Sequence, residues 1–154
     1  MISFKDAPNN EKTFVEVKSA NRLTEFGIRK AWFVSGKDIL RSANKAVLAR
    51  PRHGRVYRVK TASGRTRRHI ASRPLESHAN LSGRLRRSMQ WKVSGMQLNF
   101  GYGIAKANAP DYAPFLENGT TRMEARPTLK NAIDENRRNI EQHLIQQVNA
   151  EFNK

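Results

Sequence analysis

Residues 112–121 read YAPFLENGTT, and residues 125–129 read ARPTL. Asn118-Gly119 predicts a reversal of the chain, because glycine tolerates positive φ and asparagine enters the left-handed region more readily than most residues. Pro127 fits the first turn of a helix, where its missing N–H would have no intrahelical partner. The stretch carries no reactive residue. It predicts one or two helical turns, a turn at the glycine and then the start of the last helix.

Two long helices are predicted by apolar residues that recur every three or four positions. The first covers residues 20–49, and the second covers residues 127–148. Gly27 and Gly36 should each weaken the first helix by up to about 1 kcal/mol. The expected inner stripes are Leu23, Phe26, Ala31, Val34, Leu40, Ala43 and Val47 in the first helix, and Leu129, Ile133, Ile140, Leu144 and Val148 in the second.

Alternation of apolar and polar residues predicts strands in the rest of the chain. The clearest pattern is a hairpin over residues 90–102, and a shorter strand is expected at 14–17. Residues 1–12 are polar and rich in turn formers, so they are expected to form a loose N-terminal arm. The chain, 1–154, is therefore expected to be a single α+β domain. In it, a long N-terminal and a long C-terminal helix cover a small antiparallel sheet.

The charge of the chain is large and uneven. Its 29 Lys and Arg residues against 13 Asp and Glu residues give a formal net charge of +16. Residues 50–73 contain no acid and nine basic residues, which are Arg50, Arg52, Arg55, Arg58, Lys60, Arg65, Arg67, Arg68 and Arg73. A solvated surface would explain part of this run, but its density favours contact with a polyanion, since neutralised phosphates release counterions.

Within this run, alternation predicts a basic β-hairpin excursion from the core over residues 50–74, with strands at 55–60 and 66–70. Its thin apolar face is expected to consist of Val56, Val59 and Ile70. An isolated two-stranded hairpin is marginal in water, so a neighbour or partner is expected to order it. The expected contacts to DNA or to a partner are Arg55, Arg58, Lys60, Arg65, Arg67 and Arg68, with the last three nearest the tip.

Several kinds of site have no support in the sequence. The chain has no cysteine, which excludes disulfides and thiolate metal sites. The spacings of His53, His69, His78 and His143 match no metal-binding motif, and no acid stands in a pairing context beside them. No phosphate loop, dinucleotide-binding glycine pattern or nucleophile motif is present. We therefore expect no catalytic residue, no metal and no cofactor. The remaining enzyme hypothesis is a small nuclease that uses His69 or His53.

Nucleic-acid and membrane motifs are also missing. The aromatic residues follow core periodicities and do not alternate with arginines, so any DNA contact is expected to involve phosphates only and to read no sequence. No apolar run approaches the roughly 18 residues that a membrane-spanning helix needs, and the first residues do not resemble a signal peptide. No membrane partner is expected.

Four segments together resemble the head–tail joining, or tail-completion, proteins of tailed bacteriophages. They are His69-Ile70-Ala71-Ser72-Arg73-Pro74, then 81–89 (LSGRLRRSM), then 112–120, and finally Arg126-Pro127-Thr128-Leu129 with Ala132. The third is close to the Tyr-Ala-x-x-x-Glu-x-Gly-Thr pattern of these neck proteins, and the fourth resembles their Arg-Pro-Phe-Leu…Ala pattern. Thr128 replaces the usual aromatic residue, and Pro74 lacks the glycine that usually follows it.

The resemblance implies a structural virion protein that is made in the host cytoplasm and resides in the phage neck. Its subunits would form a ring of six or twelve copies that joins the DNA-filled head to the tail and lines the DNA channel. The implied partners are the portal or adaptor protein, the tail-terminator or tail-tube proteins, and DNA in the lumen. The head or tail side of the joint stays open, as does whether the hairpin faces DNA or protein.

The opening segment is expected to be both the hub of the fold and a subunit interface. Its expected interface residues are Tyr112, Phe115, Glu117, Asn118, Gly119, Thr120, Arg126 and Pro127. Tyr112, Phe115 and Leu116 should anchor it to the sheet, and the loop over 120–126 should project between subunits. Glu117 is expected to pair with an arginine, either Arg126 or one of a neighbouring subunit. The alternative is a basic, sequence-independent nucleic-acid-binding protein that acts on its own.

Overall fold

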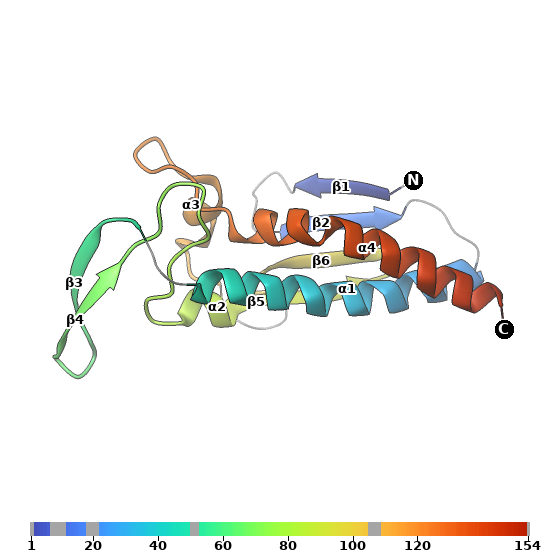
Figure 1. Cartoon of the computed structure of the whole chain (residues 1–154), viewed down its shortest axis with the longest axis horizontal. Helices are drawn as coiled ribbons and strands as arrows, with labels where there is room; N and C mark the ends of the chain where they lie inside the picture. Colours follow the sequence, from blue (N-terminus) through green and yellow to red (C-terminus); the bar gives the residue numbers. More distant parts are fainter. Residues whose placement is uncertain (1, 7–11, 18–21, 50–52, 105–108, 154) are drawn as a thin grey trace.

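The computed structural model describes residues 2–6, 12–17, 22–49, 53–104 and 109–153. Its strands are β1 (Ile2–Asp6), β2 (Lys12–Val17), β3 (Val56–Lys60), β4 (Thr66–Ile70), β5 (Met89–Ser94) and β6 (Gln97–Tyr102). Its helices are α1 (Arg22–Leu48), α2 (Arg84–Ser88), α3 (Ala113–Asn118) and α4 (Thr128–Phe152). The expected α+β class is confirmed, and α1 and α4 run side by side along the main sheet (Figure 1).

The main sheet has four strands in the order β1-β2-β6-β5, and all neighbouring strands are antiparallel. The predicted hairpin over 90–102 is β5 and β6, in which Trp91 pairs with Phe100 and Val93 pairs with Leu98. Leu98, Phe100 and Tyr102 are buried, since every second residue of β6 turns toward the helices.

The N-terminal residues differ from the expectation of a loose arm. Ile2–Asp6 form β1, which pairs with β2 from Ile2 opposite Val17 to Asp6 opposite Thr13. The prediction of a loose arm is therefore wrong for these residues, while 7–11 lie outside the described residues. The physical reason is that β2 would otherwise be an edge strand, and β1 pairs with its free backbone N–H and C=O groups.

The face of α1 that packs into the core was only partly predicted. Its buried apolar residues are Ile28, Ala31, Trp32, Ile39, Ala43 and Val47. Phe26 and Val34 were placed in the inner stripe but are exposed, and the side chain of Leu23 lies outside the described residues. Apolar residues occur around much of α1, so the packing of α4 and the sheet decides which of them are buried. Trp32 also donates its indole N–H to the carbonyl oxygen of Met96, at 2.8 Å.

The two glycines of α1 lie where other parts of the chain approach the helix. A Cβ added at Gly27 would lie 2.9 Å from the carbonyl oxygen of Gln147 in α4. A Cβ added at Gly36 would lie 2.6 Å from the ring of Trp91 in β5. Both distances are shorter than a normal carbon contact, so the low helix propensity of glycine is offset by close packing with α4 and with Trp91.

The last helix, α4, extends four residues beyond the predicted end at Val148. Its predicted inner stripe is confirmed at Leu129, Ile133, Ile140 and Leu144, which are buried, and Val148 packs against the core while half-buried. Near its end, the Nζ of Lys30 donates to Glu151 Oε1 at 2.7 Å, which joins the two long helices. Within the described ranges, none of the helices is long and apolar enough to span a membrane.

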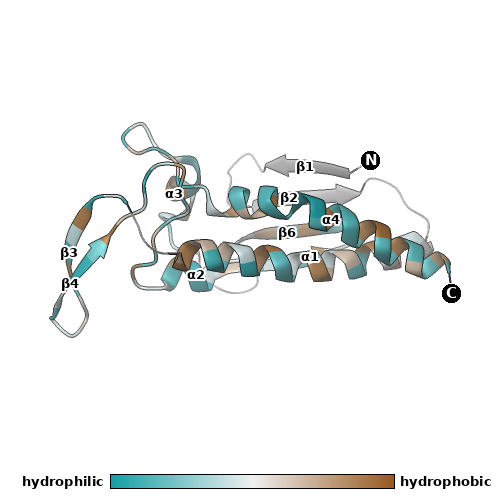
Figure 2. Ribbon diagram, viewed as in Figure 1, coloured by the Kyte–Doolittle hydropathy of each residue, from teal (hydrophilic) through white to brown (hydrophobic). Residues whose placement is uncertain are grey.

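The strands β3 and β4 form a separate antiparallel hairpin that extends from one end of the body (Figure 1). Much of β4 is hydrophilic (Figure 2). The register places Val56 opposite Ile70 and Val59 opposite Arg67. Because side chains alternate along a strand, Val59 points to the opposite face from Val56 and Ile70. The prediction that these three residues form one apolar face is therefore wrong.

Candidate functional site

Glu117 is a buried carboxylate at the point where α3 meets the start of α4. Its Oε1 accepts hydrogen bonds from the backbone N–H groups of Thr128 and Leu129, both at 3.0 Å, and from the Tyr102 hydroxyl at 2.7 Å. The first backbone N–H groups of a helix have no intrahelical acceptor, and the helix N-terminus carries partial positive charge. Glu117 therefore caps α4 from outside the helix and connects it to β6.

The expected pairing of Glu117 with Arg126 is wrong. The Arg126 Nε donates to the carbonyl oxygen of Ser72 at 3.1 Å, and its backbone N–H donates to the carbonyl oxygen of Leu116 at 2.6 Å. Arg126 thus joins α3 to the segment that follows the β3–β4 hairpin. The carboxylate is satisfied by dipolar donors at the helix start, which leaves the guanidinium to bind a backbone carbonyl.

The environment of Glu117 changes the acidity of two groups. Burial raises the pKa of the Glu117 carboxyl, although hydrogen bonds from Tyr102, Leu129 and Thr128 act in the opposite direction. Burial also raises the pKa of the Tyr102 phenol well above its ordinary value, and the charge of Glu117 adds to this effect. Tyr102 therefore remains a hydrogen-bond donor to Glu117 across the physiological pH range.

The raised pKa of Glu117 predicts a pH dependence of stability. The folded protein holds this proton more tightly than the unfolded chain. The resulting stabilisation is complete below the unfolded pKa, about 4.3, and is lost as the pH rises through the folded pKa. Relative to Glu117→Gln, the free energy of unfolding of the wild type should fall by up to about 1.4 kcal/mol per pH unit in that window. Urea denaturation of both proteins at a series of pH values measures this difference, and a pH-independent difference would contradict the prediction.

Gly119 lies directly after Glu117 and Asn118, with φ 76° and ψ −174°. Its N–H donates to the carbonyl oxygen of Phe115 at 2.9 Å, and its Cα faces the chain returning at Met123 and Ala125. The predicted chain reversal at Asn118-Gly119 is confirmed, and the loop over 120–126 projects from the body (Figure 1). Within this loop, Thr120 forms an isolated bridge with Met123.

The segment that follows the hairpin is fixed against the same unit. Leu75 has a positive φ of 64°, which is uncommon for a bulky residue, and its side chain is 71% exposed. Two hydrogen bonds hold it, from its N–H to the carbonyl oxygen of Ala125 at 2.9 Å and from Asn131 Nδ2 to its carbonyl oxygen at 3.2 Å. Sequence reasoning missed Leu75, because neither its exposure nor its conformation has a local signature.

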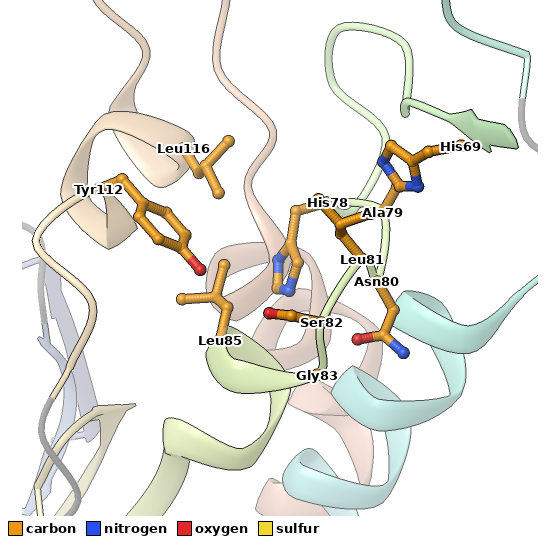
Figure 3. A pocket seen from close by; sticks show the side chains of 10 residues that line it. All are labelled: His69, His78, Ala79, Asn80, Leu81, Ser82, Gly83, Leu85, Tyr112 and Leu116. Carbon is orange, nitrogen blue, oxygen red and sulfur yellow. The ribbon is translucent and has the colours of Figure 1, made fainter. Parts of the chain in front are cut away.

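Two of the three predicted anchors of the segment lie differently from the expectation. Phe115 is 55% exposed and Tyr112 is 43% exposed, whereas Leu116 packs against the core. The side chain of Tyr112 faces a cavity of about 210 Å³, which it lines with Leu116, Leu85 and His78 (Figure 3). The prediction that Tyr112 and Phe115 anchor the segment to the sheet is wrong, because Tyr102 and Glu117 make that connection.

The remaining predicted interface residues flank these groups. Asn118 is exposed at the end of α3, and Thr120 is exposed and accepts a hydrogen bond from the backbone N–H of Arg122 at its Oγ1, at 3.2 Å. Pro127 is half-buried and stands immediately before Thr128, the first residue of α4, so it is not in the first turn as predicted. A second hollow of about 530 Å³ lies between the hairpin, the following segment and the projecting loop. It is lined by residues that include Tyr57, His69, Pro74, Arg122 and Arg126.

The register of the hairpin separates the predicted basic contacts into two groups. Val56, Arg58, Lys60, Thr66, Arg68 and Ile70 share one face, here called the cationic face. Tyr57, Val59, Arg67 and His69 share the other, here called the aromatic face, where the Arg55 guanidinium lies 5.8 Å from the ring centre of Tyr57. Arg65 closes the turn, and its carbonyl oxygen accepts the N–H of Thr61 at 2.8 Å. Arg65, Arg67 and Arg68 therefore do not form one contact surface.

The histidines have partners that their sequence neighbours did not suggest. His53 Nδ1 lies 3.3 Å from Glu76 Oε1, and His143 Nε2 lies 3.8 Å from Asp38 Oδ2. His78 Nδ1 lies 2.7 Å from Thr128 Oγ1. In the described part of the chain, no group of three or more His, Cys, Asp or Glu side chains is placed to hold a metal ion.

Comparisons with known proteins identify no relative of this chain. No family model, curated protein or solved structure matches the chain at a significant level. The resemblance of the four segments to neck proteins therefore stays an expectation, and the geometry of the end of the fold that carries them is the structural basis for a proposal.

Proposed function

We propose that this protein is a structural component of the neck of a tailed bacteriophage, where a ring of its subunits joins the head to the tail around the DNA channel. One observation carries the proposal: the four segments of the resemblance meet in one unit. Glu117 of the third segment caps the helix that begins in the fourth, and Arg126 of the fourth binds Ser72 of the first. Leu85 of the second lines the same cavity as Tyr112. Residues that lie between His69 and Ala132 thus act together, which supports a shared family structure.

Exposed apolar residues at this end of the fold suit a contact with another protein. Leu75, Leu81, Tyr112 and Phe115 are all more than 40% exposed. Leu81 and Tyr112 line the same cavity, and Leu75 is hydrogen-bonded to the base of the projecting loop. Single exposed apolar residues are common on protein surfaces, but a group of them suggests an interaction site. Contacts between two different surfaces of identical subunits close into rings when the rotation allows it.

Phe115 and Phe152 provide a matched test of this surface. Both are phenylalanines, 55% and 56% exposed. Phe115 belongs to α3, and Phe152 is the last residue of α4, whose C-terminal end lies at the opposite end of the molecule from α3 (Figure 1). We expect Phe115→Ser to weaken self-assembly by at least tenfold in concentration, because burial of one large apolar side chain contributes about 1.5–3 kcal/mol. Phe152→Ser should leave assembly unchanged. Mass photometry and native mass spectrometry over a concentration series measure both effects.

The role in the virion has its own test. Phage particles assembled without this protein should contain unjoined heads and tails in negative-stain images, and added wild-type protein should restore joining. The proposal fails if such particles are normal. It also fails if the purified protein stays monomeric and does not add to portal-containing heads or to tail tubes.

A nucleic-acid-binding protein that acts alone is the second candidate function. The observation in its favour is the set of hairpin cations that no described carboxylate pairs with. If the protein acts alone in this way, the monomer should bind duplex DNA tightly. Phe115→Ser should then change neither the assembly state nor the affinity for DNA. Assembly state therefore separates it from the neck protein.

A further inference from the structure

The hairpin places its cations in a fixed pattern that the sequence did not disclose. Arg58 is directly opposite Arg68, and Lys60 follows on the same face opposite Thr66. Directly opposite side chains in an antiparallel pair have Cβ atoms about 5 Å apart, and alternate residues on one strand are about 7 Å apart. Three cationic side chains therefore project from one side of a narrow two-stranded ribbon.

This arrangement works against the stability of the hairpin by itself. Like charges directly opposite each other destabilise a strand pair, and a lone two-stranded hairpin is already marginal. Arg58, Lys60 and Arg68 are exposed, and no carboxylate pairs with them in the part of the chain that the structure describes. An external anion with closely spaced charges would remove this repulsion.

The two faces of the hairpin have different surroundings. Tyr57 and His69 of the aromatic face line the hollow of about 530 Å³, together with Leu116 and Arg126 of the body. None of the cationic-face residues lines that hollow or the smaller cavity. The aromatic face is thus turned toward protein, and the cationic face is turned away from it.

We infer that the cationic face, through Arg58, Lys60 and Arg68, binds the phosphodiester backbone of double-stranded DNA, while the aromatic face packs against protein. The inference deepens the proposed function. It rests on that function only for where the DNA comes from, which is the genome in the channel. The two arginines and the lysine of this face contact phosphates along the DNA backbone.

The chemistry of the cationic face favours a nucleic-acid backbone over an acidic protein surface. The face lacks the Asn and Gln amides that read adenine, and its only aromatic neighbour, Tyr57, lies on the opposite side. Only Val56 and Ile70, next to the body, offer apolar area, whereas a stable protein interface has an apolar centre. Arg58, Lys60 and Arg68 supply positive charge that phosphates can neutralise in any sequence.

Two double variants of the full-length protein test the assignment at equal charge. Arg58→Gln with Arg68→Gln removes two charges from the cationic face, and Arg55→Gln with Arg67→Gln removes two from the aromatic face. The probe is a 30-base-pair duplex of random sequence, titrated by fluorescence anisotropy at several salt concentrations.

The cationic-face variant should lower the salt slope by about 2 and the affinity by roughly tenfold or more at 0.1 M salt. The aromatic-face variant should change either quantity much less, and Arg58→Lys with Arg68→Lys should keep the wild-type slope.

Several outcomes would overturn the inference. Equal losses in the two Gln variants would mean that net charge alone matters. Wild-type binding to poly-glutamate but not to duplex DNA would assign the face to an acidic protein. Thermal unfolding of each variant verifies that the fold is kept. If rings form and join heads to tails without face-specific DNA binding, this inference fails and the proposed function stands. If the protein binds DNA through the cationic face but never assembles, the proposed function fails and this inference stands.

Discussion

Replacement of Glu117 by alanine is expected to lower the free energy of unfolding by about 3–5 kcal/mol, one of the two largest losses that we predict for a single substitution. The change leaves the Tyr102 hydroxyl and the N–H groups of Thr128 and Leu129 without their acceptor. Each buried donor without a partner costs about 1–3 kcal/mol. Urea denaturation followed by circular dichroism at pH 7 measures the loss.

Glu124→Ala is the matched control, because it removes the same side chain from an exposed position of the projecting loop. It should change the stability by no more than about 0.5 kcal/mol. Glu117→Gln retains an oxygen that can accept from the helix start, so it should cost much less than Glu117→Ala. A loss below 1 kcal/mol in Glu117→Ala would show that water replaces the carboxylate and that the connection between α3, β6 and α4 is weak.

Gly119→Ala is the second substitution with a large expected effect. The backbone of Gly119, at φ 76° and ψ −174°, is in a region that is almost restricted to glycine. An added Cβ would lie 2.7 Å from the carbonyl oxygen of Met123 and 2.8 Å from the nitrogen of Ala125. Backbone strain and overlap with backbone atoms together should lower the free energy of unfolding by about 2–4 kcal/mol.

Gly64 in the hairpin turn is a comparison that has a positive φ but no steric overlap. Its φ is 77°, almost the same as that of Gly119, but a Cβ there would meet no atom within 4 Å. Gly64→Ala should therefore cost only the conformational part, about 1–2 kcal/mol. The excess cost in Gly119→Ala contains the close packing of the projecting loop together with the backbone strain at ψ −174°. Equal costs in thermal or urea unfolding would contradict the role of this packing.

Both substitutions act on the same unit, which adjoins the exposed apolar residues of the proposed interface. Glu117 and Gly119 set where α4 begins and how the loop over 120–126 returns. The exposed residues Phe115 and Leu75 are positioned by that frame. A variant that retains the fold but shifts the loop should reduce self-assembly more than Phe152→Ser does, since Phe152 lies at the other end of α4.

Several parts of the fold were predictable because their signals are local. The β5–β6 hairpin follows from alternation, α1 and α4 follow from the helical period, and the turn at Gly119 follows from Asn-Gly. Other parts depended on partners elsewhere in the chain. Phe26 and Val34 have the same apolar character as the buried Ile28, so only the positions of the sheet and α4 distinguish them.

The candidate site divides in the same way. The sequence correctly placed Glu117, Gly119 and Arg126 in one structural unit, but it paired the acid with the nearest suitable cation. In the folded protein, the start of α4 offers Glu117 two backbone N–H donors in a buried position. These donors must find an acceptor because they are buried, whereas the charge of an arginine can remain in water. The exposure of Phe115 could also not be predicted from the residues near it in the sequence.

The sequence by itself determined the α+β class, the positions of the long helices, the density of positive charge and the turn that begins at Asn118. Each of these depends on residues within a few positions of one another. Only the tertiary structure decided that Ile2–Asp6 add a strand, that Glu117 caps α4 and that the hairpin cations divide between two faces. Those outcomes depend on register and burial, which are set when segments far apart in the chain compete for the same backbone groups and the same apolar surface.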